Sequence, residues 1–97
     1  MEVKKTLNES ELLVELEGRL DTNTAPQLEE ELGNLDEVNS LKLDLVNLDY
    51  ISSAGLRVLL ALTKTMSKKG GMVITNVKPE IMEVFEMTGF TDILTIE

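Results

Sequence analysis

The sequence predicts an α/β domain with a mixed sheet of four to five strands and helices packed mainly on one face. Segments that alternate like strands and segments with helical spacing follow one another, without repeats, linkers or low-complexity stretches. Strand–helix–strand units favour parallel pairing with right-handed crossovers, whereas the first two strands are close enough to pair antiparallel. The chain of 97 residues is expected to form one domain over residues 1–97.

The first half is predicted to form two strands and one helix. Residues 3–7 are expected to form a short strand and residues 11–17 a second one, which alternates apolar and polar side chains and ends at Gly18. Thr24 is the expected N-cap of the helix, with Gln27 three positions on completing a capping box. The predicted apolar face of this helix comprises Ala25, Leu28, Leu32 and Leu35.

The second half is predicted to alternate strand and helix again. A strand over residues 41–46 leads into a largely buried helix that begins at Ser53 or Ala54 and runs to about Ser67. The remaining expected elements are, in order, a stop at Gly70-Gly71, a strand over 72–75, a helix from Pro79 to Gly89, and a terminal strand or tail over 93–96.

Composition disfavours most enzyme classes and nucleic-acid binding. The chain has no histidine and no cysteine, so it lacks the usual general base, the commonest metal ligand and any thiolate. A net charge of −9 would repel nucleic-acid phosphates and suits a protein partner with a basic patch. No apolar run has the length of a membrane span, and the lack of cysteine is typical of a cytoplasmic protein. We therefore expect no metal, no cofactor and no membrane contact.

Residues 49–57, DYISSAGLR, are the most informative stretch because they join the third predicted strand to the buried helix. Small hydroxyl residues at such a junction can cap the helix, and its free backbone N–H groups attract negative charge. A serine there is a good acceptor for a phosphate. We expect the Ser53 hydroxyl to cap the helix, and a serine of this junction to be the place for a phosphate.

Several segments together resemble the STAS-domain anti-sigma factor antagonists. The junction at 49–57 is similar to a family signature that usually reads Asp-Ser-Ser-Gly or Asp-Ser-Thr-Gly. GRLD at 18–21, LDL at 43–45 and MTGF at 87–90 match further family segments in the same order. The resemblance covers almost the whole chain and implies a single STAS-type domain.

The resemblance implies a binding function that phosphorylation controls. In the family, an anti-sigma factor that is also a serine kinase binds the unphosphorylated antagonist, releases its sigma factor, and separates once it has phosphorylated the antagonist. By position the target serine is Ser53, while Ser52 stands where the family has aspartate. The implied partners are this kinase and a phosphatase that reverses the mark, with the chain a monomer or weak dimer. The predicted partner-binding residues are Asp21, Asp49, Tyr50, Ser52, Ser53, Ala54, Gly55 and Arg57.

Four alternatives stay open at this point. The serine pair could serve only as a helix cap, or Ser52 could be the modified residue. The chain could also be a constitutive STAS scaffold in a signalling assembly without a phosphorylation switch. An enzyme would need Asp21, Asp49 and Ser53 to act as acid, base and nucleophile, without support from histidine, cysteine or a cofactor loop.

Overall fold

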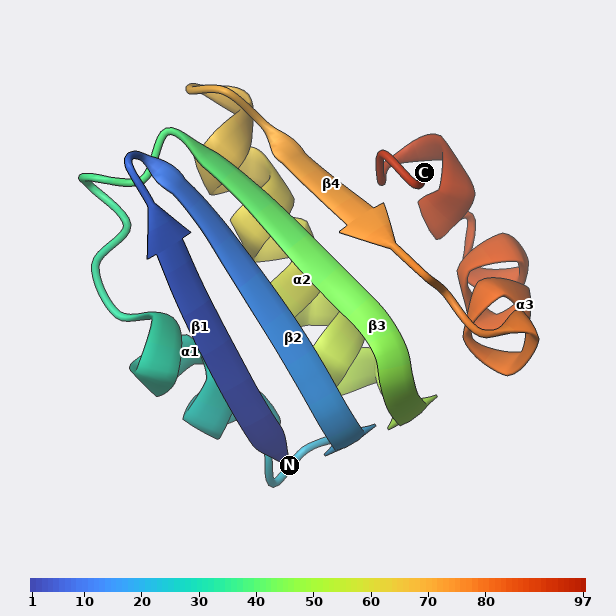
Figure 1. Cartoon of the computed structure of the whole chain (residues 1–97). Coiled ribbons are helices and arrows are strands. Elements are labelled where there is room, and N and C mark those ends of the chain that lie inside the picture. The colour runs from blue at the N-terminus through green and yellow to red at the C-terminus, as the bar shows by residue number, and fades with distance from the viewer.

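The structure is a computed structural model that describes residues 1–97 and contains one four-stranded sheet in the order β1-β2-β3-β4 (Figure 1). The first two strands pair antiparallel, and β3 is parallel to both β2 and β4. The predicted mixed sheet is confirmed, with four strands. Their bounds are β1 Glu2–Asn8, β2 Glu11–Leu20, β3 Ser40–Ile51 and β4 Met72–Thr75.

Three α-helices complete the domain: α1 (Ala25–Leu32), α2 (Ser53–Ser67) and α3 (Pro79–Thr88), followed by a short 3₁₀ turn at Phe90–Asp92. Figure 1 shows α1 and α2 on the same face of the sheet, while α3 lies beyond β4 near the C-terminus. None of these helices combines the length and the apolarity that crossing a bilayer would require.

The core lies between the sheet and its helices. All buried side chains belong to one apolar cluster, and no polar or charged side chain is buried. Strand β3 is central to it, since Leu43, Leu45 and Leu48 are fully buried and Leu59 of α2 packs on the same cluster. Because the interior is entirely apolar, every polar and charged side chain is at least partly accessible to solvent.

Three strands are longer than predicted, β1 by one residue at each end and β2 and β3 mainly at their carboxyl ends. The prediction that Gly18 ends β2 is wrong: the strand continues to Leu20, and β3 continues to Ile51 rather than stopping at residue 46. The pairing of β2 with β3 shifts register between Glu15 and Glu17 and again after Gly18, whose φ is +106°. A glycine tolerates that conformation within an irregular strand. It therefore marks a bulge rather than a stop.

The predicted capping box of α1 is also wrong. Thr24 is the N-cap residue, as predicted, but its side chain makes no cap bond, and the Gln27 side chain donates to Met1 O and to Glu31 Oε2 instead. The start of α2 at Ser53 is confirmed, as is Gly89 as the left-handed C-cap of α3. Residues 93–96 form a tail whose only pairing is a single parallel bridge from Ile96 to Ile74.

Candidate functional site

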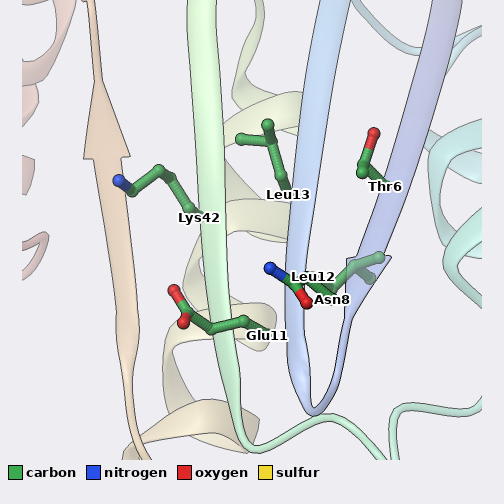
Figure 2. A pocket seen from close by; sticks show the side chains of 6 residues that line it. All are labelled: Thr6, Asn8, Glu11, Leu12, Leu13 and Lys42. Carbon is green, nitrogen blue, oxygen red and sulfur yellow. The ribbon is translucent and has the colours of Figure 1, made fainter.

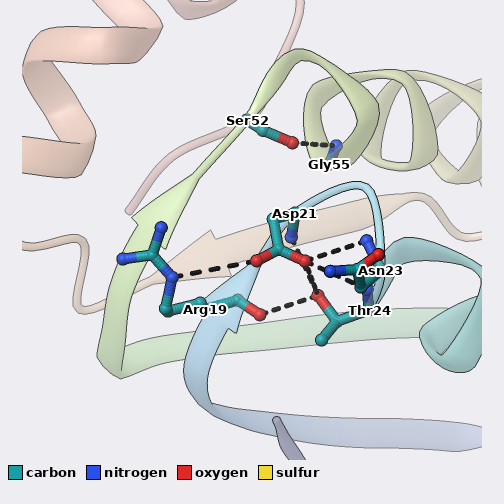
Figure 3. Close-up of polar contacts among 6 residues, drawn as sticks. All are labelled: Arg19, Asp21, Asn23, Thr24, Ser52 and Gly55. Carbon is teal, nitrogen blue, oxygen red and sulfur yellow. Dashed lines mark hydrogen bonds and ion pairs between the residues drawn. The ribbon is translucent and has the colours of Figure 1, made fainter.

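The junction at residues 49–57 lies at the edge of the sheet where β2 and β3 end together. Leu20 and Ile51 are register partners at these ends, and the Ser52 N–H donates to Leu20 O over 2.9 Å. The β2–α1 turn and the N-terminus of α2 are thus held side by side (Figure 3). Parallel pairing requires this meeting of carboxyl ends, which is where α/β sheets commonly bind ligands.

The two serines have different structural roles. Ser52 is the N-cap of α2: its backbone is extended, with φ −103° and ψ 177°, and its Oγ accepts from Gly55 N at 3.5 Å. Ser53 is the first helical residue and its side chain is exposed. The prediction that Ser53 caps the helix is therefore wrong, because the hydroxyl one position earlier occupies the cap. The Ser53 hydroxyl makes no hydrogen bond within the chain.

Gly55 brings the first turn of α2 against the strand ends. A Cβ at this position would lie 2.8 Å from Ile51 Cγ1, 2.8 Å from Leu20 Cγ and 2.9 Å from Leu20 O. Such distances are too short for carbon atoms in a packed interior, so only glycine fits without a shift. Ala54, beside it, is half-buried. The glycine of the motif is thus required by packing.

Asp21 is engaged by the turn that follows β2. Its Oδ1 accepts from the backbone N–H groups of Asn23 at 3.0 Å and Thr24 at 3.1 Å, and from the Thr24 hydroxyl (Figure 3). Desolvation raises the pKa of Asp21, but the hydrogen bonds from Thr24 and Asn23, helped by the charge of Arg19, outweigh it. The pKa of Asp21 is therefore lowered from its ordinary value of 3.8. The carboxylate is a fixed negative charge beside the junction.

Arg19 is a site residue that the sequence did not indicate. Its guanidinium carbon lies 4.1 Å from the centroid of the Tyr50 ring, and its Nε lies 3.7 Å from Asp21 Oδ2. Arg19 and Tyr50 are register partners at the ends of β2 and β3. Because the sequence predicts that β2 ends at Gly18, it does not place Arg19 opposite Tyr50. Tyr50 is 41% exposed, and Arg19 stacks on its ring in a cation–π contact.

Asp49 lies apart from these groups in its contacts. Its Oδ1 accepts from Nζ of Lys78, the residue that precedes α3, at 2.7 Å, and both side chains are partly exposed. No hydrogen bond joins Asp21 or Asp49 to Ser53. The acid–base–nucleophile set considered for an enzyme is therefore not assembled.

A shallow groove of about 350 Å³ runs beside the junction between the first turns of α1 and α2. Arg57 of α2 and Glu29 of α1 both line it. Neither makes an ion pair within 4.0 Å. The other lining residues are Thr22, Ala25, Pro26, Ala54 and Val58.

A second depression, of about 240 Å³, lies at the other end of the sheet. Figure 2 shows Thr6, Leu13 and Lys42 lying side by side across β1, β2 and β3, as their register requires. Asn8, Glu11 and Leu12 complete its lining. No cluster of three or more acidic side chains suited to a metal ion occurs here or elsewhere in the chain.

Comparison with known proteins agrees with this architecture. The family model described as "STAS domain" matches residues 2–97. BtrV of Bordetella bronchiseptica, assigned as an anti-sigma factor antagonist, is 41% identical over 88 residues, which cover 88% of this chain and 76% of BtrV. The anti-sigma-B factor antagonist of Bacillus subtilis is 33% identical over 91 residues, covering 92% of this chain and 84% of that protein.

Solved structures show the same fold. The antagonist SpoIIAA in its unphosphorylated form matches with a TM-score of 0.76 at 15% identity, covering 99% of this chain and 87% of that one. The phosphorylated form of SpoIIAA from Bacillus gives the same TM-score at 16% identity, covering 99% of this chain and 91% of that one. The chain belongs to the STAS-domain anti-sigma factor antagonist family.

Proposed function

We propose that the protein is a phosphorylation-controlled binding module: it binds an anti-sigma factor that is also a serine kinase, and phosphorylation at Ser53 releases it. The observation that carries this proposal is the exposed and unengaged Ser53 hydroxyl at the first residue of α2. Membership in a family whose relatives are named anti-sigma factor antagonists supplies the partner class. Through that partner the protein would control transcription that depends on a sigma factor.

The surroundings of Ser53 explain how a phosphate would act. A phosphate adds about −1.5 to −2 charge at neutral pH. The fixed Asp21 carboxylate lies beside the junction, and the chain as a whole carries −9. A partner packed over this surface would have to desolvate the new charge, which costs several kcal/mol unless a cation meets it. Each ~1.4 kcal/mol weakens binding about tenfold, so one modification is enough to end the association.

The fold itself can accept the phosphate. Ser53 is exposed at a helix N-terminus, where unpaired N–H groups and the helix dipole favour negative charge. The equal similarity of this chain to the two forms of SpoIIAA agrees with a modification that leaves a STAS fold in place. The proposed switch therefore acts on the interface and not on folding.

Phosphate mapping tests the assignment of Ser53. The protein is incubated with the purified anti-sigma serine kinase of the same organism and ATP, and the phosphate is located by mass spectrometry. We expect a single phosphate on Ser53, and Ser53→Ala should abolish it while Ser52→Ala should retain it. A phosphate on Ser52, or on a residue away from the junction, contradicts the assignment.

A constitutive scaffold is the competing function, and the serine in place of the family aspartate is the observation that favours it. Ser52 nevertheless fills the N-cap, a role that aspartate also performs well. Light scattering distinguishes the two functions in solution. A monomer or weak dimer agrees with the switch, and a stable high-order homo-oligomer would support the scaffold.

A further inference from the structure

We propose that Arg57 is the intramolecular counter-charge for a phosphate on Ser53, and that the same guanidinium binds the partner when Ser53 is unmodified. The inference rests on the proposed function, because it assigns a second residue, Arg57, to the same phosphorylation switch. Phosphorylation would add a charge to the docking surface and at the same time withdraw a cation from it.

The spacing of the two residues supports the pairing. Ser53 and Arg57 are four positions apart in α2, so their side chains lie on neighbouring turns of one helical face. Long helical side chains favour rotamers that point back toward the N-terminus, so the Arg57 guanidinium can reach the Ser53 side chain on the preceding turn. A guanidinium binds phosphate oxygens through two parallel N–H bonds, and such charge-assisted bonds are about twice as strong as neutral ones.

Arg57 is also the cation in this region that has no other contact. The chain has two arginines, and Arg19 is already held by Tyr50 and Asp21. Lys78 is paired with Asp49. Arg57 is exposed and makes no ion pair or hydrogen bond, although Glu29 lines the same groove. Its guanidinium is therefore available to a carboxylate of a partner before modification and to the phosphate afterwards.

The phosphate itself reports the pairing. Phosphoserine is placed at position 53 of the full chain by genetic-code expansion, and the second pKa of its phosphate is measured by ³¹P NMR. The charged groups at this edge of the sheet are Arg19, Asp21, Glu29, Arg57 and the Asp49–Lys78 pair, and only Arg57 is changed. We expect Arg57→Gln to raise the phosphate pKa by about 0.5 unit, because the dianion loses a cation four residues away on the same helical face, while Arg57→Lys should give a smaller rise.

Lys64→Gln is the matched control. Lys64 is another exposed cation of α2, seven residues beyond Arg57, and its removal changes the net charge equally. It lies about 16 Å along the helix from Ser53, beyond the screening length of about 8–10 Å at physiological salt. Equal pKa shifts in the two glutamine variants would overturn the pairing.

Binding by the unmodified protein tests the other half. With Ser53 unphosphorylated, Arg57→Gln should weaken binding to the purified anti-sigma serine kinase about tenfold, and Lys64→Gln should not. Unchanged affinity in Arg57→Gln would overturn the docking role. The NMR titration uses a phosphate that no kinase has installed, so its result is independent of the kinase mapping. The Arg57 pairing can therefore be contradicted while the mapping still identifies Ser53, and the mapping can contradict Ser53 while the titration still shows the pairing.

Discussion

At the scale of single residues, two adjacent serines have different roles: Ser52 caps α2, and Ser53 is the proposed site of phosphorylation. Ser52 holds the first turn of α2 through its contact with Gly55 N, and this leaves Ser53 exposed and without a contact. Phosphorylation of the capping residue itself would instead change the group that contacts the Gly55 N–H. The observed division allows charge to be added without removing a structural contact.

Removing the cap should cost stability without touching the proposed switch. Ser52→Ala is expected to lower the free energy of unfolding by about 0.5–1 kcal/mol, near the low end for N-caps because the observed contact is long. Ser52→Asp should match or exceed wild type, since aspartate caps well and suits the helix dipole. Urea denaturation measures both, and a Ser52→Ala variant as stable as wild type contradicts the role of Ser52.

Gly55 should not tolerate a side chain. Gly55→Ala is expected to destabilise the fold by about 1–3 kcal/mol through its clash with Leu20 and Ile51, although alanine is the better helix former. Ser53→Ala, which introduces the same residue at an exposed position of the same turn, should stay within about 0.5 kcal/mol of wild type. Thermal unfolding compares the two, and equal melting temperatures would show that α2 does not contact the strand ends as described.

The ionisation of Asp21 should make part of the stability depend on pH. Its pKa is lowered in the folded protein, so its stabilising contribution is present at neutral pH and is lost as the pH falls from 3.8 through the folded value. Asp21→Asn keeps an oxygen acceptor for the turn but removes the charge. The stability difference between wild type and variant should be largest near pH 7 and narrow below about pH 4, as measured by urea denaturation across pH. A difference that does not change with pH contradicts the assignment.

At the scale of elements, the spacing of apolar residues together with the glycine, proline and capping signals predicts all four strands and all three α-helices but not their exact ends. In β2, the regular alternation of buried and exposed residues ends at Leu16, and the following Gly18 indicates a turn. In the structure, a bulge lets the strand continue to Leu20. Likewise, Thr24 and Gln27 fit a capping box in sequence, but Asp21 Oδ1 already accepts from the Thr24 N–H and the Thr24 hydroxyl accepts from the Asp21 N–H, while the Gln27 side chain donates to Met1 O.

The same limit applied to the candidate site. Ser52, Ser53 and Gly55 could be found from one continuous stretch of sequence. The stack of Arg19 on Tyr50 depends on strand register across 31 positions, and a register shift precedes it. No local pattern predicts such a pair. Structure was therefore needed to show which cations near Ser53 are engaged and which one is not.

The position of Ser53 within α2 can be tested by proline. Proline is accepted at the first helical position, where the N–H has no helical partner, and the extended Ser52 is compatible with a following proline. Ser53→Pro should therefore fold with stability near that of wild type. Arg57→Pro, inside the same helix, should cost about 3 kcal/mol or more. Circular dichroism during thermal unfolding measures both, and strong destabilisation by Ser53→Pro would place Ser53 inside the helix instead.

At the scale of the whole molecule, the proposed docking surface is assembled from elements that pack on one apolar core. The strand ends, the Asp21 turn, the Arg19–Tyr50 stack and the first turn of α2 meet at one edge of the sheet. In the proposed switch, this surface would keep its shape when Ser53 gains a phosphate. Binding would thus be controlled by charge on a fixed shape.

The most direct test of this account is the affinity of the purified anti-sigma serine kinase for two forms of the protein, unmodified and with phosphoserine at position 53, measured by isothermal titration calorimetry. Circular dichroism of both forms confirms that the fold is retained. We predict that the phosphate weakens binding at least about 100-fold, corresponding to about 2.7 kcal/mol. Equal affinity of the two forms would contradict it.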